Sequence, residues 1–254
     1  ATGKLRWVYQ TVHHDIWDMD IGGQPTLVDI DTPKGKVPSV VATTKTGHIF
    51  VIDRRNGALV VPAPEKPVPT DNPAPGDRLS PTQPYSALSF LPERNISETD
   101  MWGTTPFDQM ACRIIYKNHR YEGPFTPQTV GEKGKGAIIS PGPLGIFEWG
   151  GASVDPVRQL LILNPNYMGF LERLVPREKA NAKGGTGGEM GLQPQTGIPF
   201  AVEIGPFLSP LGFPCQAPPW GYVAAVDLKT MKKVWMHKNG TTRDSAPVPI
   251  ALPL

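Results

Sequence analysis

Aromatic and titratable side chains are concentrated near the start of the chain, in residues 7–18, which read W-V-Y-Q-T-V-H-H-D-I-W-D. Two tryptophans, a tyrosine, two histidines and two carboxylates share this short stretch. Aromatic walls can hold a flat organic cofactor, and a titratable group beside it can move a proton. The alternative is a strand end followed by a polar turn, and this stretch alone fits both interpretations.

His13 and His14 are candidates for the substrate side of such a pocket, although packed or surface histidines fit the sequence equally well. A zinc site is not indicated, because no further His or Cys lies at ligand spacing. The two histidines are therefore candidates for substrate contact and not for metal binding.

The composition predicts a globular all-β protein with long ordered loops. The 254 residues include 27 glycines and 30 prolines, and 39% are hydrophobic, which is enough for a core. A formal net charge of +2 gives no case for nucleic acid or an acidic membrane surface. The most apolar stretch, residues 197–213, carries Glu203 and prolines, so no membrane helix is expected in the chain.

The two cysteines leave two alternatives open. Cys112 and Cys215 either form one disulfide in an oxidising compartment or remain two buried thiols. The chain starts without a methionine or a signal peptide, and we therefore expect a mature or excised piece.

A hairpin-like unit recurs in the chain. Residues 224–235 read A-A-V-D-L-K-T-M-K-K-V-W and residues 50–61 read F-V-I-D-R-R-N-G-A-L-V-V. In each, an Asp ends an apolar strand, a polar turn follows, and a large apolar residue comes eight positions after the Asp. The opening residues 2–7, T-G-K-L-R-W, match the second half of this unit, so we expect the chain to begin in the middle of a repeat.

Three hairpins are predicted from these patterns. Short β-rich runs at 40–44 and 48–53 are separated by Lys45-Thr46-Gly47, and similar pairs lie at 222–228 with 234–236 and at 154 with 160–163. Trp7 and Trp235 are assigned to packing between such units. Recurring antiparallel hairpins with a tryptophan at a fixed offset are typical of propeller blades.

A long excursion interrupts the hairpins at about residues 62–147. The proline-rich segment 62–84 is expected to be an extended surface loop, and Thr105 followed by Pro106 predicts one short helix over 106–119. The glycine-rich segments 132–136 and 184–188 lack phosphate-loop features and predict flexible loops. About three and a half blades remain, so residues 1–254 are expected to be an internal segment of one larger propeller domain.

Several longer motifs resemble one family. They are Y-Q-T-V-H-H-D-I-W-D-M-D, K-T-G-H-I-F-V-I-D-R-R-N-G, V-P-A-P-E-K-P-V-P, G-I-F-E-W-G-G-A-S-V-D-P and P-W-G-Y-V-A-A-V-D-L-K-T. They resemble the membrane-bound quinoprotein glucose dehydrogenases and the related quinate/shikimate dehydrogenases. The resemblance implies an eight-bladed propeller of W-type antiparallel blades that holds pyrroloquinoline quinone (PQQ) and calcium.

The resemblance also implies a location and a reaction. The catalytic domain would face the periplasm at the bacterial inner membrane, behind an N-terminal anchor that we expect to lie outside this chain. It would oxidise a sugar or cyclic polyol and pass electrons to ubiquinone. Glucose and quinate or shikimate remain alternative substrates. A non-catalytic propeller that binds partners is the alternative from another class.

Residue roles follow from the same resemblance. Asp18 matches the catalytic carboxylate, which would take a substrate hydroxyl proton, and Asp15 is the competing carboxylate. Lys45 matches the lysine beside the quinone oxygens, where a cation stabilises developing negative charge. Asn164 matches a cofactor-contacting asparagine. Trp149 is predicted to contact the cofactor. Glu148, His13 and His14 are predicted to lie near the substrate.

Much of the family's cofactor-binding set has no counterpart in this sequence. The residues that bind the quinone's carboxylates, stack on its ring and complete the calcium shell would come largely from segments outside residues 1–254. No metal ligand is therefore assigned. Because each missing charge-assisted contact weakens binding, the isolated chain is expected to bind cofactor weakly or not at all.

Overall fold

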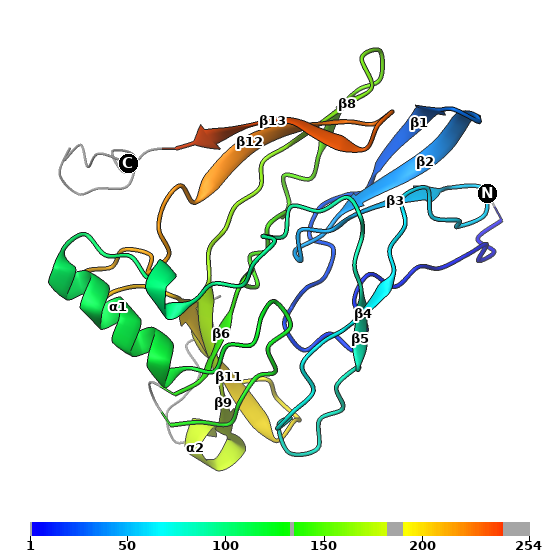
Figure 1. Ribbon diagram of the computed structural model, residues 1–254. Helices are drawn as coiled ribbons and strands as arrows, with labels where there is room; N and C mark the ends of the chain where they lie inside the picture. Colours follow the sequence, from blue (N-terminus) through cyan, green and yellow to red (C-terminus); the bar gives the residue numbers. More distant parts are fainter. Residues whose placement is uncertain (1, 133–134, 182–189, 241–254) are drawn as a thin grey trace.

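The computed structural model describes residues 2–132, 135–181 and 190–240, and most of its regular structure is antiparallel sheet (Figure 1). The first sheet has the order β1-β2-β3, formed by Thr26–Thr32, Gly35–Thr43 and Ile49–Asp53. The predicted hairpin at 40–53 is confirmed as β2 and β3. Its turn closes through a 2.9 Å hydrogen bond from Gly47 N to Thr44 O, and Gly47 adopts the positive φ of +85° that glycine tolerates.

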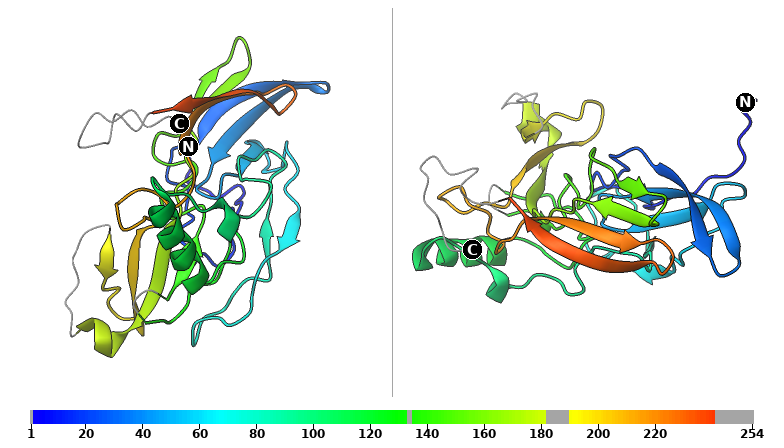
Figure 2. Two further views of the ribbon diagram at one scale, coloured as in Figure 1. Left: turned by 60° about the vertical axis from the view of Figure 1, so that its left-hand side comes forward. Right: turned by 90° about the horizontal axis from the view of Figure 1, so that it is seen from above.

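The second sheet has the order β13-β12-β8-β7 and lies beside the first (Figures 1 and 2). Its strands are Lys232–Asn239, Gly221–Asp227, Leu160–Leu163 and Ser153–Asp155, which confirms the other two predicted hairpins. The two sheets share one apolar core that includes Val28, Val51, Leu161 and Val226. Each such side chain removed from water contributes about 1.5–3 kcal/mol, so this core holds the neighbouring sheets together.

A third sheet, in the order β10-β11-β9-β6, was not predicted from the sequence. It is formed by Gly191–Gln193, Phe200–Pro206, Phe170–Pro176 and Ala137–Ile139. β6 pairs with β9 across more than thirty residues of chain, as in Ile138 opposite Leu171. Such pairing leaves no local turn signal in the sequence.

The expectation of a purely irregular loop at 62–84 was wrong in part. β4, Glu65–Pro67, and β5, Thr82–Pro84, form a two-stranded antiparallel ribbon within it. Proline lacks an N–H but keeps its carbonyl, and Tyr85 N donates to Pro64 O at 2.9 Å. Prolines that act only as acceptors are therefore compatible with a short ribbon.

The predicted helix is confirmed as α1, Pro106–Asn118, with the Thr105 hydroxyl oxygen accepting a hydrogen bond from Asp108 N at 3.1 Å. The expectation of one helix was incomplete. A five-residue helix α2, Arg177–Asn181, and a 3-10 turn at Glu98–Asp100 are also present. Elements of one turn are too short to produce a helical period in the sequence.

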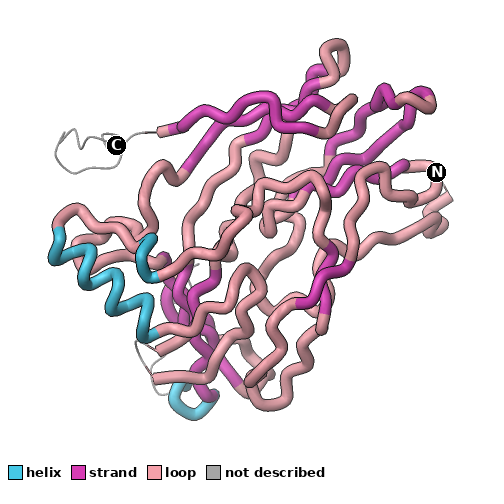
Figure 3. Tube along the Cα trace, in the orientation of Figure 1, coloured by secondary structure: helices cyan, strands magenta, loops and turns pink. Residues whose placement is uncertain are grey.

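Cys112 and Cys215 form a disulfide, which settles the alternative that the sequence left open. The bond ties α1 to the loop before β12 across 103 residues of chain. Loops occupy much of the chain between the sheets (Figure 3). Among the described residues, no helix combines the length and apolar character needed to cross a membrane.

The expectation that residues 2–7 form the second half of a hairpin was wrong. No strand precedes Thr26 in the described chain. Trp7 instead packs against Gly57 at the turn after β3 and donates its indole N–H to Arg54 O at 3.1 Å. Trp235, by contrast, lies within β13 opposite Ala225. Two glycine-rich segments were predicted to be flexible loops. Segment 184–188, and residues 133–134 of segment 132–136, lie outside the described residues.

Candidate functional site

Trp17 anchors the loop that carries the candidate carboxylates. Its side chain is buried, its ring packs edge-on against Phe125, and its indole N–H donates to Thr126 O at 2.7 Å. Burying a large aromatic side chain with its polar group satisfied fixes the position of the backbone on either side of it. The loop therefore presents its acidic side chains from a rigid base.

Asp15 and Asp18, the two competing carboxylates, have different environments. The Asp15 oxygens accept hydrogen bonds from Trp17 N at 2.9 Å and Met19 N at 2.8 Å, so this side chain shapes the loop. Desolvation raises the pKa of Asp15, the two backbone hydrogen bonds oppose that rise, and the charges of Asp18 and Asp20 add to it. Asp18 has a 69% exposed side chain and a φ of +63°, in the left-handed region that Asp tolerates.

Lys45 lies in the turn between β2 and β3, yet it is only 6% exposed. A neighbouring loop covers it, because Ile146 N donates to Lys45 O at 2.8 Å and Gly145 lies against the lysine stem. A Cβ on Gly145 would come within 2.5 Å of Lys45 Cβ. The buried position of this lysine therefore depends on a glycine about a hundred residues further along the chain.

Three carboxylates surround the Lys45 ammonium. Nζ lies 2.6 Å from Asp20 Oδ1, 3.1 Å from Asp18 Oδ2 and 3.3 Å from Glu148 Oε1. Burial alone would lower the pKa of Lys45, but hydrogen bonds to Asp20 and Asp18 outweigh it and hold the pKa above its ordinary value. The lysine is therefore a permanent cation with a fixed position.

The sequence analysis did not select Asp20, although the sequence held a signal for it. Met19 is fully buried, and the side chains of Asp18 and Asp20 on either side of it are both more than half exposed. The alternation D-M-D therefore places two carboxylates together on the exposed side of the chain, where both reach Lys45.

The other predicted cofactor residues lie on or near the loop that carries Glu148. A Cβ on Gly22 would come within 2.7 Å of Glu148 Oε2, so the Glu148 carboxylate lies directly against this glycine. Trp149 follows it and has an 81% exposed indole. Asn164 is exposed at the end of β8, and its amide lies near Gly150. The structure thus places Lys45, Glu148, Trp149 and Asn164 in one region.

The two histidines lie elsewhere. His13 Nε2 pairs with Glu65 Oε1 at 2.8 Å, and its backbone N–H donates to Gln83 at 2.7 Å. His14 Nε2 lies 3.2 Å from Asp77 Oδ1. Neither ring lines the cavity described next, but Asp77 does.

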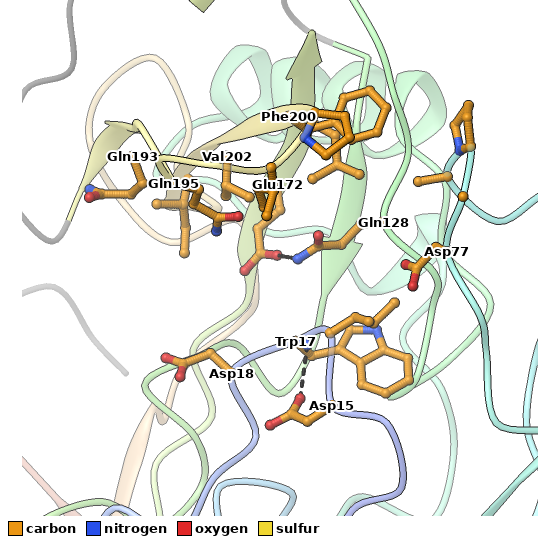
Figure 4. A pocket seen from close by; sticks show the side chains of 18 residues that line it. Asp15, Trp17, Asp18, Asp77, Gln128, Glu172, Gln193, Gln195, Phe200 and Val202 are labelled. Carbon is orange, nitrogen blue, oxygen red and sulfur yellow. Dashed lines mark hydrogen bonds between the residues drawn. The ribbon is translucent and has the colours of Figure 1, made fainter. Parts of the chain in front are cut away.

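A cavity of about 730 Å³ opens between this loop and the third sheet (Figure 4). Asp15, Trp17 and Asp18 form one wall, and residues of β9, β10 and β11 form the opposite wall. Asp18 therefore borders both the cavity and the Lys45 cluster. The acidic side chains that line the cavity are Asp15, Asp18, Asp77 and Glu172, and the amides are Gln128, Gln193 and Gln195.

Glu172, in the middle of β9, is a site candidate that the sequence analysis missed. Its side chain is 3% exposed and accepts a hydrogen bond from the Gln128 amide. Burial raises the pKa of Glu172 to about 8, the bond from Gln128 opposes this, and the charges of Asp18 and Asp15 add to it. A carboxylate within the apolar run F-L-E-R-L-V was the available signal.

No group of three or more His, Cys, Asp or Glu side chains that could hold a metal ion occurs within residues 2–132, 135–181 and 190–240. The acidic side chains near Lys45 are instead occupied by its ammonium. Nothing in this part of the chain therefore assigns a metal ligand.

Comparison with known proteins gives a consistent result. A family model described as PQQ glucose/ethanol/alcohol dehydrogenase, β-propeller domain, matches residues 1–254. The quinoprotein glucose dehydrogenase of Escherichia coli (strain K12) is 54% identical over 98% of this chain and 31% of its own length.

More distant relatives follow the same pattern. The quinate/shikimate dehydrogenase (quinone) of Acinetobacter baylyi (strain ATCC 33305 / BD413 / ADP1) is 38% identical over 100% of this chain and 32% of its own length. Among solved structures, a europium-containing methanol dehydrogenase aligns with a TM-score of 0.49 and 20% identity, over 93% of this chain and 31% of that one. The chain thus spans about a third of the length of the curated relatives.

Proposed function

Because this chain belongs to the family of PQQ-dependent glucose, ethanol and alcohol dehydrogenase β-propeller domains, we propose that it supplies part of the active site of a quinoprotein dehydrogenase. The observation that carries the proposal is the 3.1 Å contact between Asp18 and the buried Lys45 ammonium at the edge of a cavity. We propose further that residues 1–254 are an internal segment of one propeller domain. The insertion at 62–147 belongs to the same domain.

The residues around Lys45 fit one edge of PQQ, a flat polycarboxylated o-quinone. A buried ammonium suits the quinone oxygens, the exposed indole of Trp149 offers a flat face, and the exposed amide of Asn164 offers donors and an acceptor. When bound, PQQ supplies the group that accepts the hydride. Calcium is the second cofactor that the family resemblance suggests, but the described residues form no cation site, and no step is assigned to it.

Asp18 is proposed as the general base. Lys45 holds Asp18 Oδ2, while Oδ1 accepts no hydrogen bond from the described residues and can receive the hydroxyl proton of a substrate in the cavity. Asp15 is less suited to this task, because both of its oxygens are used by backbone N–H groups. The ammonium of Lys45 stays charged during the reaction and stabilises negative charge that develops nearby.

The proposed substrate is a sugar or cyclic polyol of the glucose type, and quinate or shikimate is the alternative within the family. Ubiquinone as electron acceptor and the periplasmic face of the bacterial inner membrane follow from the family resemblance. The disulfide between Cys112 and Cys215 supports an oxidising compartment. A non-catalytic binding module is disfavoured, because the family model that matches residues 1–254 describes dehydrogenases.

Asp18→Asn in the full-length enzyme, reconstituted with PQQ and calcium, tests this proposal. Loss of a general base should lower kcat by about 10²–10⁴-fold with glucose in a dye-reduction assay. Quinate is assayed in parallel. Asp31→Asn, at an exposed surface ion pair, is the control and should leave kcat unchanged. Wild-type kcat in Asp18→Asn would refute Asp18 as the base, and failure of the wild-type enzyme to use either substrate would refute the proposed glucose or quinate substrate.

A further inference from the structure

The charged side chains that line the cavity beside Asp18 are all acidic. Four carboxyl groups and three amides are among its lining residues, and the described lining includes no Lys, Arg or His side chain. A second anion would enter this cavity against like charge. A neutral ligand rich in hydroxyl groups, by contrast, can use both the acceptors and the amide donors.

Glu172 and Gln128 form a connected pair on the far wall of this cavity. The Gln128 amide donates to Glu172 Oε2, and this bond fixes the orientation of both groups (Figure 4). Glu172 is almost wholly buried, so its carboxyl group meets the cavity and the protein but little bulk water. A buried polar pair that lines a cavity is preorganised for a ligand.

The groups that face Glu172 favour its uncharged form. Asp15 and Asp18 approach Glu172 from the N-terminal loop, and the apolar Val202 approaches it from β11. Gln128 lies just after Thr126, whose carbonyl oxygen accepts the Trp17 indole hydrogen bond. Arg173, the next residue in β9, pairs instead with Glu203. Because the side chain is buried and both charged neighbours are acidic, the pKa of this carboxyl group is raised to about 8 and it keeps its proton at neutral pH.

We propose that Glu172 and Gln128 form a hydroxyl-binding subsite in which Glu172 acts as a neutral hydrogen-bond donor and selects uncharged polyols over carboxylated ones. A carboxylic acid donates through its O–H and accepts through its C=O, and the neighbouring amide oxygen accepts as well. This pattern matches adjacent hydroxyls on a sugar ring. The inference rests on the proposed function, because it assigns the substrate side of the same site and names its class.

The discriminating variants are Glu172→Gln and Glu172→Met in the full-length holoenzyme. Glutamine keeps a neutral donor of the same shape and should hold KM for glucose within about threefold of wild type at pH 7. Methionine keeps the length but removes both hydrogen bonds, and should raise KM by about 10–100-fold with kcat changed less than threefold. Glu178→Gln, an exposed glutamate on α2, is the matched control and should change neither.

The pH profile gives a readout that a merely structural role would not move. The donor form of Glu172 is present below its raised pKa of about 8 and is lost above it. In the wild type, KM for glucose should therefore rise as pH increases from about 7 to 9. In Glu172→Gln the same rise should be absent, because an amide does not titrate in this range.

Binding without turnover is measured by calorimetry with 1,5-anhydro-D-glucitol as a neutral probe and quinate as an anionic one. The neutral probe should bind the wild type and Glu172→Gln with similar Kd and Glu172→Met about 10–100-fold more weakly, and quinate should bind the wild type more weakly than the neutral probe. Gln128→Leu should also raise the Kd of the neutral probe. This variant replaces Glu172→Met if Glu172→Met fails to fold.

Unchanged KM and Kd in Glu172→Met or Gln128→Leu would overturn the subsite. A pH-dependent KM that survives in Glu172→Gln, or tighter binding of quinate than of the neutral probe, would overturn the neutral-donor assignment. These results leave the role of Asp18 intact, because that role is measured by kcat. Loss of kcat in Asp18→Asn together with unchanged binding would, in turn, leave the subsite intact.

Discussion

Lys45→Met removes the ammonium that three carboxylates share. Methionine is unbranched and of similar length, so it can keep the contact of the side-chain stem with Gly145 while deleting the charge. Asp18, Asp20 and Glu148 then face one another without a cation between them. We expect a less stable protein and a lower kcat.

The size of the stability loss follows from the distances. Lys45→Met removes three attractions, from Nζ to Asp20 at 2.6 Å, to Asp18 at 3.1 Å and to Glu148 at 3.3 Å, while the repulsion between the carboxylates is present in both proteins. Because both aspartates are more than half exposed, each ion pair contributes only about 0.2–1 kcal/mol. Three such pairs give a loss of about 2 kcal/mol.

The assay is calorimetric melting of the full-length enzyme at about 0.01 M and about 1 M salt, across which the Debye length falls from about 30 Å to about 3 Å. A loss of about 2 kcal/mol lowers Tm by about 4–8 °C in a domain of about 150–250 residues, and by less in the larger propeller domain to which this segment is proposed to belong. The difference from wild type should be largest at low salt and shrink at high salt. Lys36→Met, at an exposed pair 3.6 Å from Asp31, is the control and should shift Tm much less than Lys45→Met does.

Either of two results would contradict this reasoning. An unchanged Tm in Lys45→Met would mean that solvent already screens the three carboxylates from the Lys45 ammonium. A drop of equal size at both salt concentrations would mean that lost packing, and not charge, causes the destabilisation.

Two further predictions concern the segments that hold the site in place. Gly145→Ala should destabilise the enzyme and raise the cofactor Kd, because φ at this position is +70° and the new Cβ would meet the Lys45 stem. Gly212→Ala is the control: φ is +82° and the space around it is open, so urea unfolding should show only the conformational cost of about 1–2 kcal/mol. Replacing Cys112 and Cys215 by serine should lower stability by up to about 4.7 kcal/mol, the value for a closed loop of about 100 residues, and a reducing agent should lower the Tm of the wild type but not of this variant.

The elements predicted from the sequence are those with local signals. The hairpin of β2 and β3 has apolar runs on both sides of a Lys-Thr-Gly turn, and α1 has a Thr-Pro start. The third sheet lacks such signals, because β6, β9 and β11 are far apart in sequence and β9 carries Glu172 and Arg173 between its apolar residues. Its pairing follows from tertiary contacts that a period-two pattern does not encode.

The site was predicted only in part for the same reason. Asp18 and Lys45 were selected through the family resemblance, and the structure brings them together at 3.1 Å. Position 45 lies in a hairpin turn, where a lysine is ordinarily solvated. The Gly145 loop is what buries this lysine, and no turn rule can reveal a partner so far along the chain. Gln128 was missed because an isolated amide in a loop has no distinguishing pattern.

Asp18 connects the two halves of the site, and hydrogen bonds of the neighbouring Asp15 and Trp17 hold its backbone in place. The Asp15 carboxylate holds Trp17 N and Met19 N, and the Trp17 indole holds Thr126 O, two residues before Gln128. Hydrogen bonds thus link the backbone on either side of the proposed base to the segment that carries Gln128. Because a displacement of about 1 Å can cost roughly 10²-fold in rate, a rigid link between base and substrate wall is what proton transfer from a bound polyol requires.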